Sequence, residues 1–339
     1  MIDFRYHLVS LISVFLALAV GIILGAGPLQ NAIGDQLNEQ VAALRTERTD
    51  LRDSLGRTEA ELADQHAYAL AAGAELAAGS LEGMQVAVVD VDGLPDTVEI
   101  EVVNQLEDAG ARVVAQSSLT PAWTSAEESV LRSTVADGQR GNLGESVADD
   151  ATTAQVLGTV LGTALTESDP QVPGVPSQRS TDLYELLTTV GLVESRFAPS
   201  APADAVLLLA DGGEEAAASE SAEASETPED VDMVSTSIAL ESVAGTVVVA
   251  APTVVDGDLV AEIRADEDAV TVLSTVSGIE QDVMRFDVPL AIAAHSAGEI
   301  GQYGFEEGAT VVPPVVDRSD GGEDEGSAAD GGAADDGDS

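Results

Sequence analysis

Two residue types are missing from this sequence altogether. Its 339 residues include no cysteine and no lysine, so all 13 basic residues are arginine. Without cysteine, the chain cannot form a disulfide framework, a thiolate metal site or a thiol nucleophile. Without lysine, it cannot complete a phosphate-binding G-x-x-x-x-G-K-[ST] loop, and neither G-x-G-x-x-G nor the G-x-S-x-G turn of serine hydrolases occurs where it would be needed.

Positive charge is scarce as well. The 61 acidic residues bring the formal net charge to −48. Nucleic-acid binding depends on a basic surface that this chain lacks, so we expect no nucleic-acid partner. The acidity is otherwise typical of a highly soluble protein.

What the sequence does have is one long apolar stretch near its start. The 19 residues from Leu8 to Ala26 carry no ionisable side chain and no proline. At ~1.5 Å per residue they span a hydrocarbon core of ~30 Å, whereas the apolar part of a signal peptide is usually only ~7–15 residues long. We therefore predict a retained transmembrane helix over 8–27, although the small residues at its end keep cleavage open as the alternative.

The charges on either side of this stretch predict its orientation. Arg5, His7 and the terminal amine precede it, and the first charges after it are Asp35 and Glu39. The positive-inside rule then places residues 1–7 in the cytoplasm and the rest of the chain outside, in a single-pass protein of the cell membrane.

Small residues recur every four positions inside the predicted span, at Ala17, Gly21 and Gly25. Such a stripe lets two membrane helices pack closely, although glycine is also simply common in membrane helices. We expect the stripe to continue into the segment that follows.

That segment, residues 31–78, shows the heptad spacing of a coiled coil. The predicted seam consists of Leu37, Val41, Leu44, Arg48, Leu51, Leu55, Thr58 and Leu62. Arg48 and Thr58 are polar at core positions, which lowers stability and can fix register or partner. The segment therefore predicts a homo- or hetero-oligomer, with a lone amphipathic helix lying on its own domain as the alternative.

The pattern of apolar runs in the rest of the chain predicts an α/β domain over 84–316. Valine-rich runs that do not alternate begin at Gln85, Asp204, Gly245 and Ala269, and helical patterns lie between them. This order predicts a doubly wound, Rossmann-like domain with a buried parallel sheet. Ser125 and Glu128 are spaced as a capping box at the start of one of its helices. Two acidic segments, 211–232 and 317–339, have too little apolar surface to fold and are predicted to be disordered.

The strongest local pattern for an enzyme is Asp90-Val91-Asp92-Gly93, at the end of the first predicted strand. It resembles the start of haloacid-dehalogenase-type phosphatases, with Ser117 or Ser118 in the place of that family's second motif. However, those enzymes need a lysine, and Leu94 stands where they have threonine. Since turns also use Asp and Gly for backbone reasons, we predict that the protein is not an enzyme.

Metal ligands are scattered. The methionines and histidines are isolated along the sequence, at Met1, Met84, Met233, Met284, His7, His66 and His295. Soft copper sites use clusters of such residues, so the sequence predicts neither a metal site nor a cofactor.

Three stretches together resemble one known family. They are Arg5-Tyr6-His7 leading straight into the apolar helix, Leu273-Ser274-Thr275-Val276, and Tyr303-Gly304. With the heptad helix and the VAVVD strand, they make the chain similar to the actinobacterial MctB copper transporter family, which includes SteB-type envelope proteins. Residues 277–301 depart from the Ala/Leu-rich helix expected there.

The resemblance implies two different functions. One is an outer-membrane protein that limits copper inside the cell. The other is a bitopic protein that acts with a SteA-like membrane partner in envelope assembly and cell division. A barrel pore needs many alternating segments of ~9–11 residues, and the sequence shows one apolar helix instead. We therefore expect the envelope role, with copper transport as the alternative.

Overall fold

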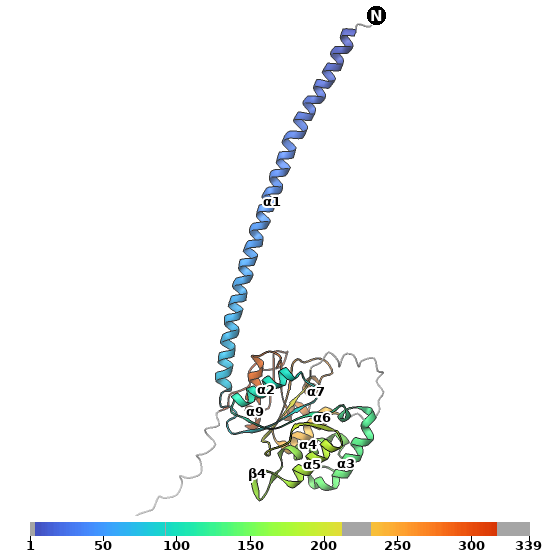
Figure 1. Cartoon of the computed structure of the whole chain (residues 1–339), viewed down its shortest axis with the longest axis vertical. Coiled ribbons are helices and arrows are strands. Elements are labelled where there is room, and N and C mark those ends of the chain that lie inside the picture. Colours follow the sequence, from blue (N-terminus) through green and yellow to red (C-terminus); the bar gives the residue numbers. More distant parts are fainter. Residues whose placement is uncertain (1–3, 92, 212–231, 317–339) are drawn as a thin grey trace, which may run out of the picture. The chain divides into compact units, whose positions relative to one another are not determined.

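The computed structural model describes residues 4–91, 93–211 and 232–316, and it leaves out the side chains of 26–34 and Glu145. Asp92 and nearly all of the two acidic segments predicted to be disordered therefore lie outside the described residues. The chain divides into two units, residues 1–68 and 69–339, and each is considered by itself (Figure 1).

The first unit is part of a single helix, α1 (Phe4–Ala77), which runs without interruption through the predicted membrane span and the predicted heptad segment. Within it, Phe4–Gly25 is long and apolar enough to cross a membrane. The boundary between membrane and coiled-coil parts stays a prediction, because the backbone does not change there.

The second unit is built on a sheet of seven strands in the order β5-β2-β1-β6-β7-β8-β9. All neighbours are parallel except β5, which is antiparallel to β2. The strands are β1 (Gln85–Asp90), β2 (Arg112–Leu119), β5 (Val193–Phe197), β6 (Ala205–Leu209), β7 (Val247–Ala251), β8 (Ser274–Ser277) and β9 (Gln302–Tyr303). A separate hairpin joins β3 (Ser168–Asp169) to β4 (Val172–Pro176). The predicted α/β fold class with a mostly parallel sheet is confirmed.

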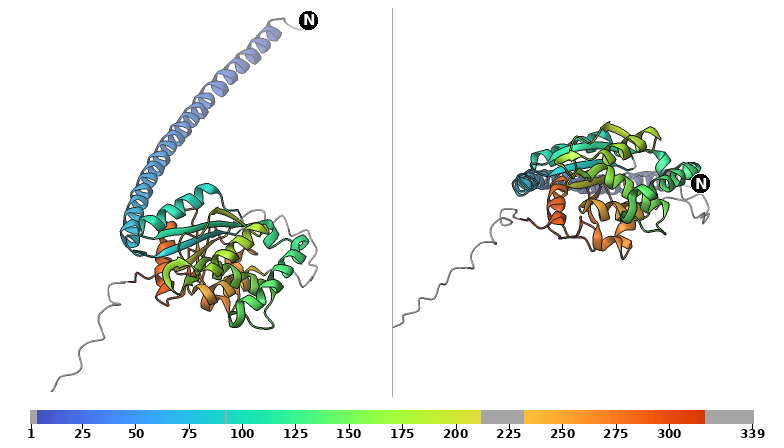
Figure 2. Two further views of the ribbon diagram at one scale, coloured as in Figure 1. Left: turned by 60° about the horizontal axis from the view of Figure 1, so that its bottom comes forward. Right: turned by 90° about the horizontal axis from the view of Figure 1, so that it is seen from below.

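Helices cover both faces of this sheet (Figure 2). One face packs against α2 (Asp96–Asp108) and α9 (Asp287–Ser296). The other face packs against a larger set, namely α3 (Ser129–Leu143), α4 (Thr153–Thr166), α5 (Gln178–Thr189), α6 (Met233–Ala244), α7 (Leu259–Ala265) and α8 (Ala269–Val272). Because both faces are covered, β1, β6 and β7 are buried at almost every position, which explains why these strands do not alternate.

Helix α4 is buried at eleven of its fourteen positions, and two glycines let it approach α6. A Cβ on Gly158 would collide with the backbone carbonyl of Thr236, and one on Gly162 would lie 3.2 Å from Cβ of Val243. The helix starts with a capping box formed by Thr152 and Gln155.

Two local predictions were wrong. The run from Ala269 does not begin as a strand: Asp266 Oδ1 accepts hydrogen bonds from the amides of Asp268 and Ala269, which starts the short helix α8 before β8. The capping box at Ser125 does not form either, since its side chain accepts from the amide of Glu127 and opens a 3₁₀ turn.

Candidate functional site

All eight positions of the predicted seam lie on α1 and are exposed. Val41 is 40% exposed and Leu51 is 64% exposed, so large apolar side chains meet solvent at regular heptad intervals. The Thr58 hydroxyl donates back to the carbonyl of Ser54 at 3.0 Å, so its polar group is satisfied within the helix. The first unit thus presents an apolar stripe that no other described residue of that unit covers.

Charged side chains of opposite sign flank the seam, and the sequence interpretation overlooked them. Glu47 immediately precedes Arg48, and Arg52 immediately follows Leu51. In heptad terms these are a g position and the e position of the next heptad. Two parallel helices in register bring such positions together, which is how coiled coils select orientation and partner. The places of Glu47 and Arg52 beside two seam residues were the available signal.

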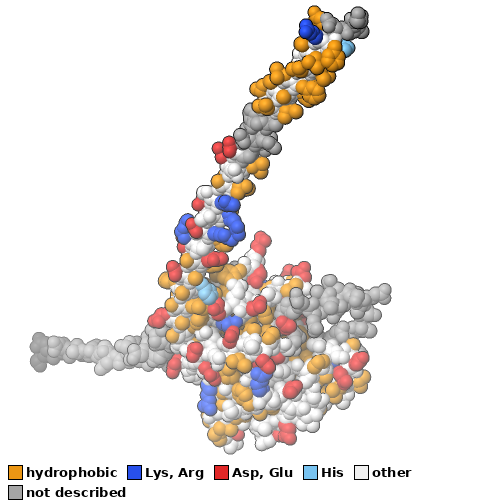
Figure 3. Space-filling view, turned by 45° about the horizontal axis from the view of Figure 1, so that its top comes forward, with side chains coloured by type: hydrophobic (Ala, Val, Ile, Leu, Met, Phe, Trp, Pro, Cys, Tyr) orange, Lys and Arg blue, Asp and Glu red, His pale blue; other side chains and the backbone are white. Residues whose placement is uncertain are grey.

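The small-residue stripe does not continue into the seam, contrary to expectation. Since α1 is continuous and each residue turns the helix by ~100°, the stripe at Ala17, Gly21 and Gly25 lies about 120–200° around the axis from Leu37. A Cβ added at Gly21 or Gly25 would meet nothing within 4 Å. The helix therefore presents two separate faces, one small and one heptad-spaced; apolar and charged regions succeed each other along it (Figure 3).

The segments that carry the family resemblance fall in two places. Arg5, Tyr6 and His7 form the exposed first turns of α1. The other two segments, far apart in sequence, are neighbours in the sheet: Val276 of β8 pairs with Tyr303 of β9.

Arg264 of α7 joins these two strands. Its guanidinium donates to Thr275 Oγ1 at 2.9 Å and to the carbonyl of Tyr303 at 2.8 Å, and it lies 3.1 Å from Glu306 Oε2. Burial acts to raise the pKa of Glu306, but hydrogen bonds from Ser277 and Arg264 outweigh it and hold that pKa below its usual value. These contacts of Arg264 hold β8 and β9 together at the end of the sheet. The two family segments on these strands therefore have a structural role.

Asp90, the first carboxylate of the enzyme-like pattern, holds a turn. It is 6% exposed, and its Oδ1 accepts from the amides of Gly93 at 2.9 Å and Leu94 at 3.0 Å. Asp92 lies outside the described residues. On the neighbouring strand, Ser117 Oγ is 2.7 Å from the hydroxyl of Tyr184. The aspartate and this serine are thus both engaged in holding the fold.

The three histidines belong to two different helices. His7 and His66 lie on α1, and His295 on α9 lies 3.3 Å from Glu241 of α6. Among the described residues, no group of three or more His, Asp or Glu side chains is arranged to hold a metal ion.

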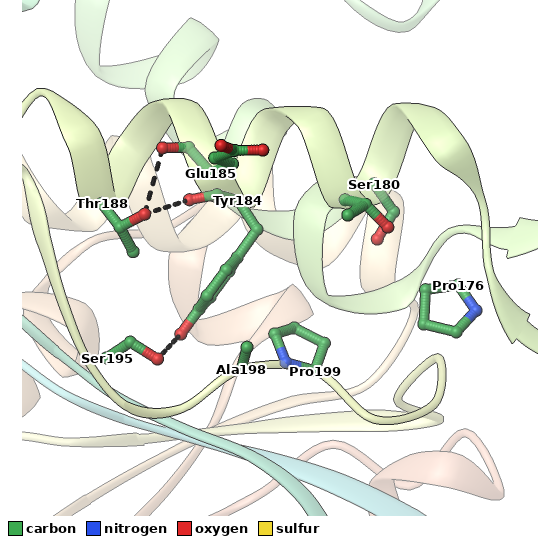
Figure 4. A pocket seen from close by; sticks show the side chains of 9 residues that line it. Pro176, Ser180, Tyr184, Glu185, Thr188, Ser195, Ala198 and Pro199 are labelled. Atoms are coloured by element: carbon green, nitrogen blue, oxygen red, sulfur yellow. Dashed lines mark hydrogen bonds between the residues drawn. The ribbon is translucent and has the colours of Figure 1, made fainter.

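One groove on the second unit was not predicted from the sequence. It has a volume of about 320 Å³ and lies between α5 and the end of β5 (Figure 4). Its lining consists of Pro176, Ser180, Thr181, Tyr184, Glu185, Thr188, Ser195, Ala198 and Pro199. The Tyr184 side chain reaches from the helix to the strand and donates to Ser195 Oγ at 2.7 Å. No sequence pattern marks this groove, because its walls come from separate elements within residues 176–199 that meet only in the folded domain.

Comparison with known proteins gives a consistent result. A family model described as "Copper transport outer membrane protein, MctB" matches residues 1–314. A protein named "Copper transporter MctB" from Mycobacterium tuberculosis is 29% identical over 328 residues, covering 92% of this chain and 99% of the relative. One of the same name from Mycobacterium leprae is 27% identical over 330 residues, with the same coverage.

Proposed function

The chain belongs to the MctB family, and on this premise we propose that it is a non-enzymatic, membrane-anchored protein that acts in cell-envelope assembly or division. It pairs with a second copy through the seam on α1 and presents its α/β domain outside the cell. A SteA-like membrane partner, implied by the family resemblance, is the second component we expect.

The observation that carries this proposal is the exposed, heptad-spaced seam with its flanking charges. Glu47 of one copy faces Arg52 of the other in a parallel pair, and the symmetric contact forms on the other side. Arg48 occupies a core position, and in such a pair it lies near Glu47 of the other copy. Because two anchored helices enter from one membrane, a parallel arrangement is also the one that the anchors allow.

The orientation follows from the charges at the two ends of the apolar part of α1. Arg5 and His7 precede it, while Asp35 and Glu39 follow it. The positive-inside rule puts the short start in the cytoplasm and the second unit outside the cell membrane. Placement in an outer membrane, as the description of the family model has it, is the alternative.

A second candidate function is copper transport or copper homeostasis, with copper as cargo. Its support is the family match together with the names of the relatives. This candidate and the envelope role predict different defects in cells that lack the protein.

Complementation of such cells tests the proposal. We expect the wild-type chain to restore normal division, and the double variant Leu44→Glu, Leu51→Glu to fail. The matched control Thr46→Glu, Ala60→Glu places the same charges on the opposite face of α1 and should restore division fully. Cellular copper content is measured in parallel and should not change.

Three results would contradict the proposal. If loss of the protein changed copper content while leaving division intact, copper transport would replace the envelope role. If the seam variant complemented as well as its control, the seam would have no part in the function. A phosphatase activity that disappeared in Asp90→Asn would contradict the non-enzymatic assignment.

A further inference from the structure

Strand β5 forms one edge of the seven-stranded sheet. It pairs with β2 on one side, and no other described strand pairs with it. The main chain of an edge strand carries N–H and C=O groups that another extended chain can use. Four of its five residues, from Glu194 to Phe197, are exposed, so this edge is accessible within the described domain.

The groove described above runs beside this edge. Ser180, Tyr184 and Thr188 are spaced four residues apart, so they form one face of α5 and line the groove along two helical turns. Ser195 and Ala198 line the opposite side. A groove bounded by a helix and an edge strand is the geometry in which proteins bind peptides by strand addition.

The size and lining of the groove suit side chains rather than a whole cofactor. Its volume of about 320 Å³ is at the lower end for small-molecule sites. Pro176, Ala198 and Pro199 supply apolar walls, while the Tyr184–Ser195 hydrogen bond holds the helix and strand at a fixed separation (Figure 4). Alternate residues of a strand added to β5 would point into this space, because side chains of a strand alternate between faces.

Charge identifies the kind of peptide. Glu185 lines the groove and Glu194 lies on the edge strand, and both are exposed. None of the ion pairs among the described residues involves either of them, whereas the nearby Arg196 is paired with Asp96 at 2.7 Å and Glu99 at 3.1 Å. The edge therefore offers free negative charge to a ligand, in a chain whose net charge is −48.

We propose that the groove between α5 and β5 binds an extended segment of a partner protein that carries apolar side chains flanked by Lys or Arg. The segment adds to the free edge of β5, its apolar side chains enter the groove, and its basic residues pair with Glu185 and Glu194. This site is independent of the seam on α1, so either assignment can fail without the other.

The probe is a library of random dodecapeptides displayed on phage and selected against the full chain in nanodiscs. We expect the selected peptides to combine β-branched or aromatic residues with Lys or Arg, and to slow hydrogen exchange at the amides of β5. In the variant Ala198→Trp, which fills the groove, binding of the selected peptides should weaken at least tenfold. Glu185→Arg, on the exposed face of α5, should weaken it similarly without affecting the fold.

Asp182→Arg is the matched control, because it makes the same charge change on the same helix at an exposed position that does not line the groove. It should leave peptide binding within about twofold. The proposal is overturned if no basic peptides are enriched, if the control weakens binding as much as Glu185→Arg, or if bound peptides leave exchange at β5 unchanged. A preference for small apolar molecules that compete away the peptides without protecting β5 would also overturn it.

Discussion

The hydroxyl of Tyr184 lies 2.7 Å from Oγ of both Ser117 and Ser195, and so joins α5 to two neighbouring strands. Ser117 belongs to β2 and Ser195 to the edge strand β5. The hydrogen bond to Ser117 is buried and the one to Ser195 is partly buried. Water therefore competes little with the bond to Ser117. One phenol group thus holds the helix at the edge of the sheet.

Removing that hydroxyl should weaken the domain. In Tyr184→Phe both serine hydroxyls lose a partner, and we expect the free energy of unfolding to fall by about 1–2 kcal/mol. Urea titration of the full chain in detergent measures this. Tyr68→Phe is the control, because Tyr68 is 77% exposed and its replacement should change stability by less than about 0.5 kcal/mol. Equal stability of the two variants would show that the network contributes nothing.

The close packing of α4 on α6 leads to a second prediction. Gly158→Ala forces a methyl group against the carbonyl of Thr236 and should cost about 1–3 kcal/mol of stability. Gly138 lies on an exposed part of α3 where an added Cβ meets nothing. Gly138→Ala should therefore stabilise the protein by about 0.5–1 kcal/mol, since it only restricts the unfolded chain. Thermal unfolding compares the two, and the same sign for both would contradict the packing argument.

Asp287 makes stability depend on pH. Burial raises the pKa of this carboxyl to about 7, far above its unfolded value of about 3.9. Between about pH 4 and 7 the native state then binds more protons than the unfolded state, so this group makes the free energy of unfolding fall as pH rises. Asp287→Asn stays neutral, and its stability relative to wild type should increase from about pH 4 to about pH 7 and stay level above that.

Denaturant unfolding at several pH values checks this behaviour. Asp149→Asn, a change of the same kind at an exposed position, should follow the wild-type pH profile. If Asp287→Asn also followed that profile, the Asp287 carboxyl would have the same pKa in the folded and unfolded protein. The conclusion that burial raises this pKa would then be wrong.

The parts of the fold that could be predicted are those dictated by local pattern. The valine-rich runs of β1, β6 and β7 are buried on both faces, and composition alone reveals such strands. Strands β5 and β9 escaped prediction because the first is mostly exposed and the second has two residues held by tertiary contacts such as that of Arg264. Their positions depend on partners distant in sequence.

The candidate sites divide in the same way. The seam was predictable because heptad spacing is a local property of one helix. The relation between the seam and the small-residue stripe was not, since it depends on the helix remaining continuous between residues 25 and 37. The groove was invisible in the sequence because Pro176, Tyr184 and Ser195 meet only in the folded domain.

Pairing of two copies through the seam is the central claim, and the absence of cysteine makes a clean test possible. A single cysteine is introduced at Leu44, or on the opposite face of α1 at Asp53, and membranes are oxidised mildly. In a parallel coiled coil the two copies of residue 44 lie within disulfide reach, whereas those of residue 53 do not. We predict that Leu44→Cys gives a covalent dimer and Asp53→Cys remains a monomer. Equal crosslinking of the two variants, or none in either, would contradict the account.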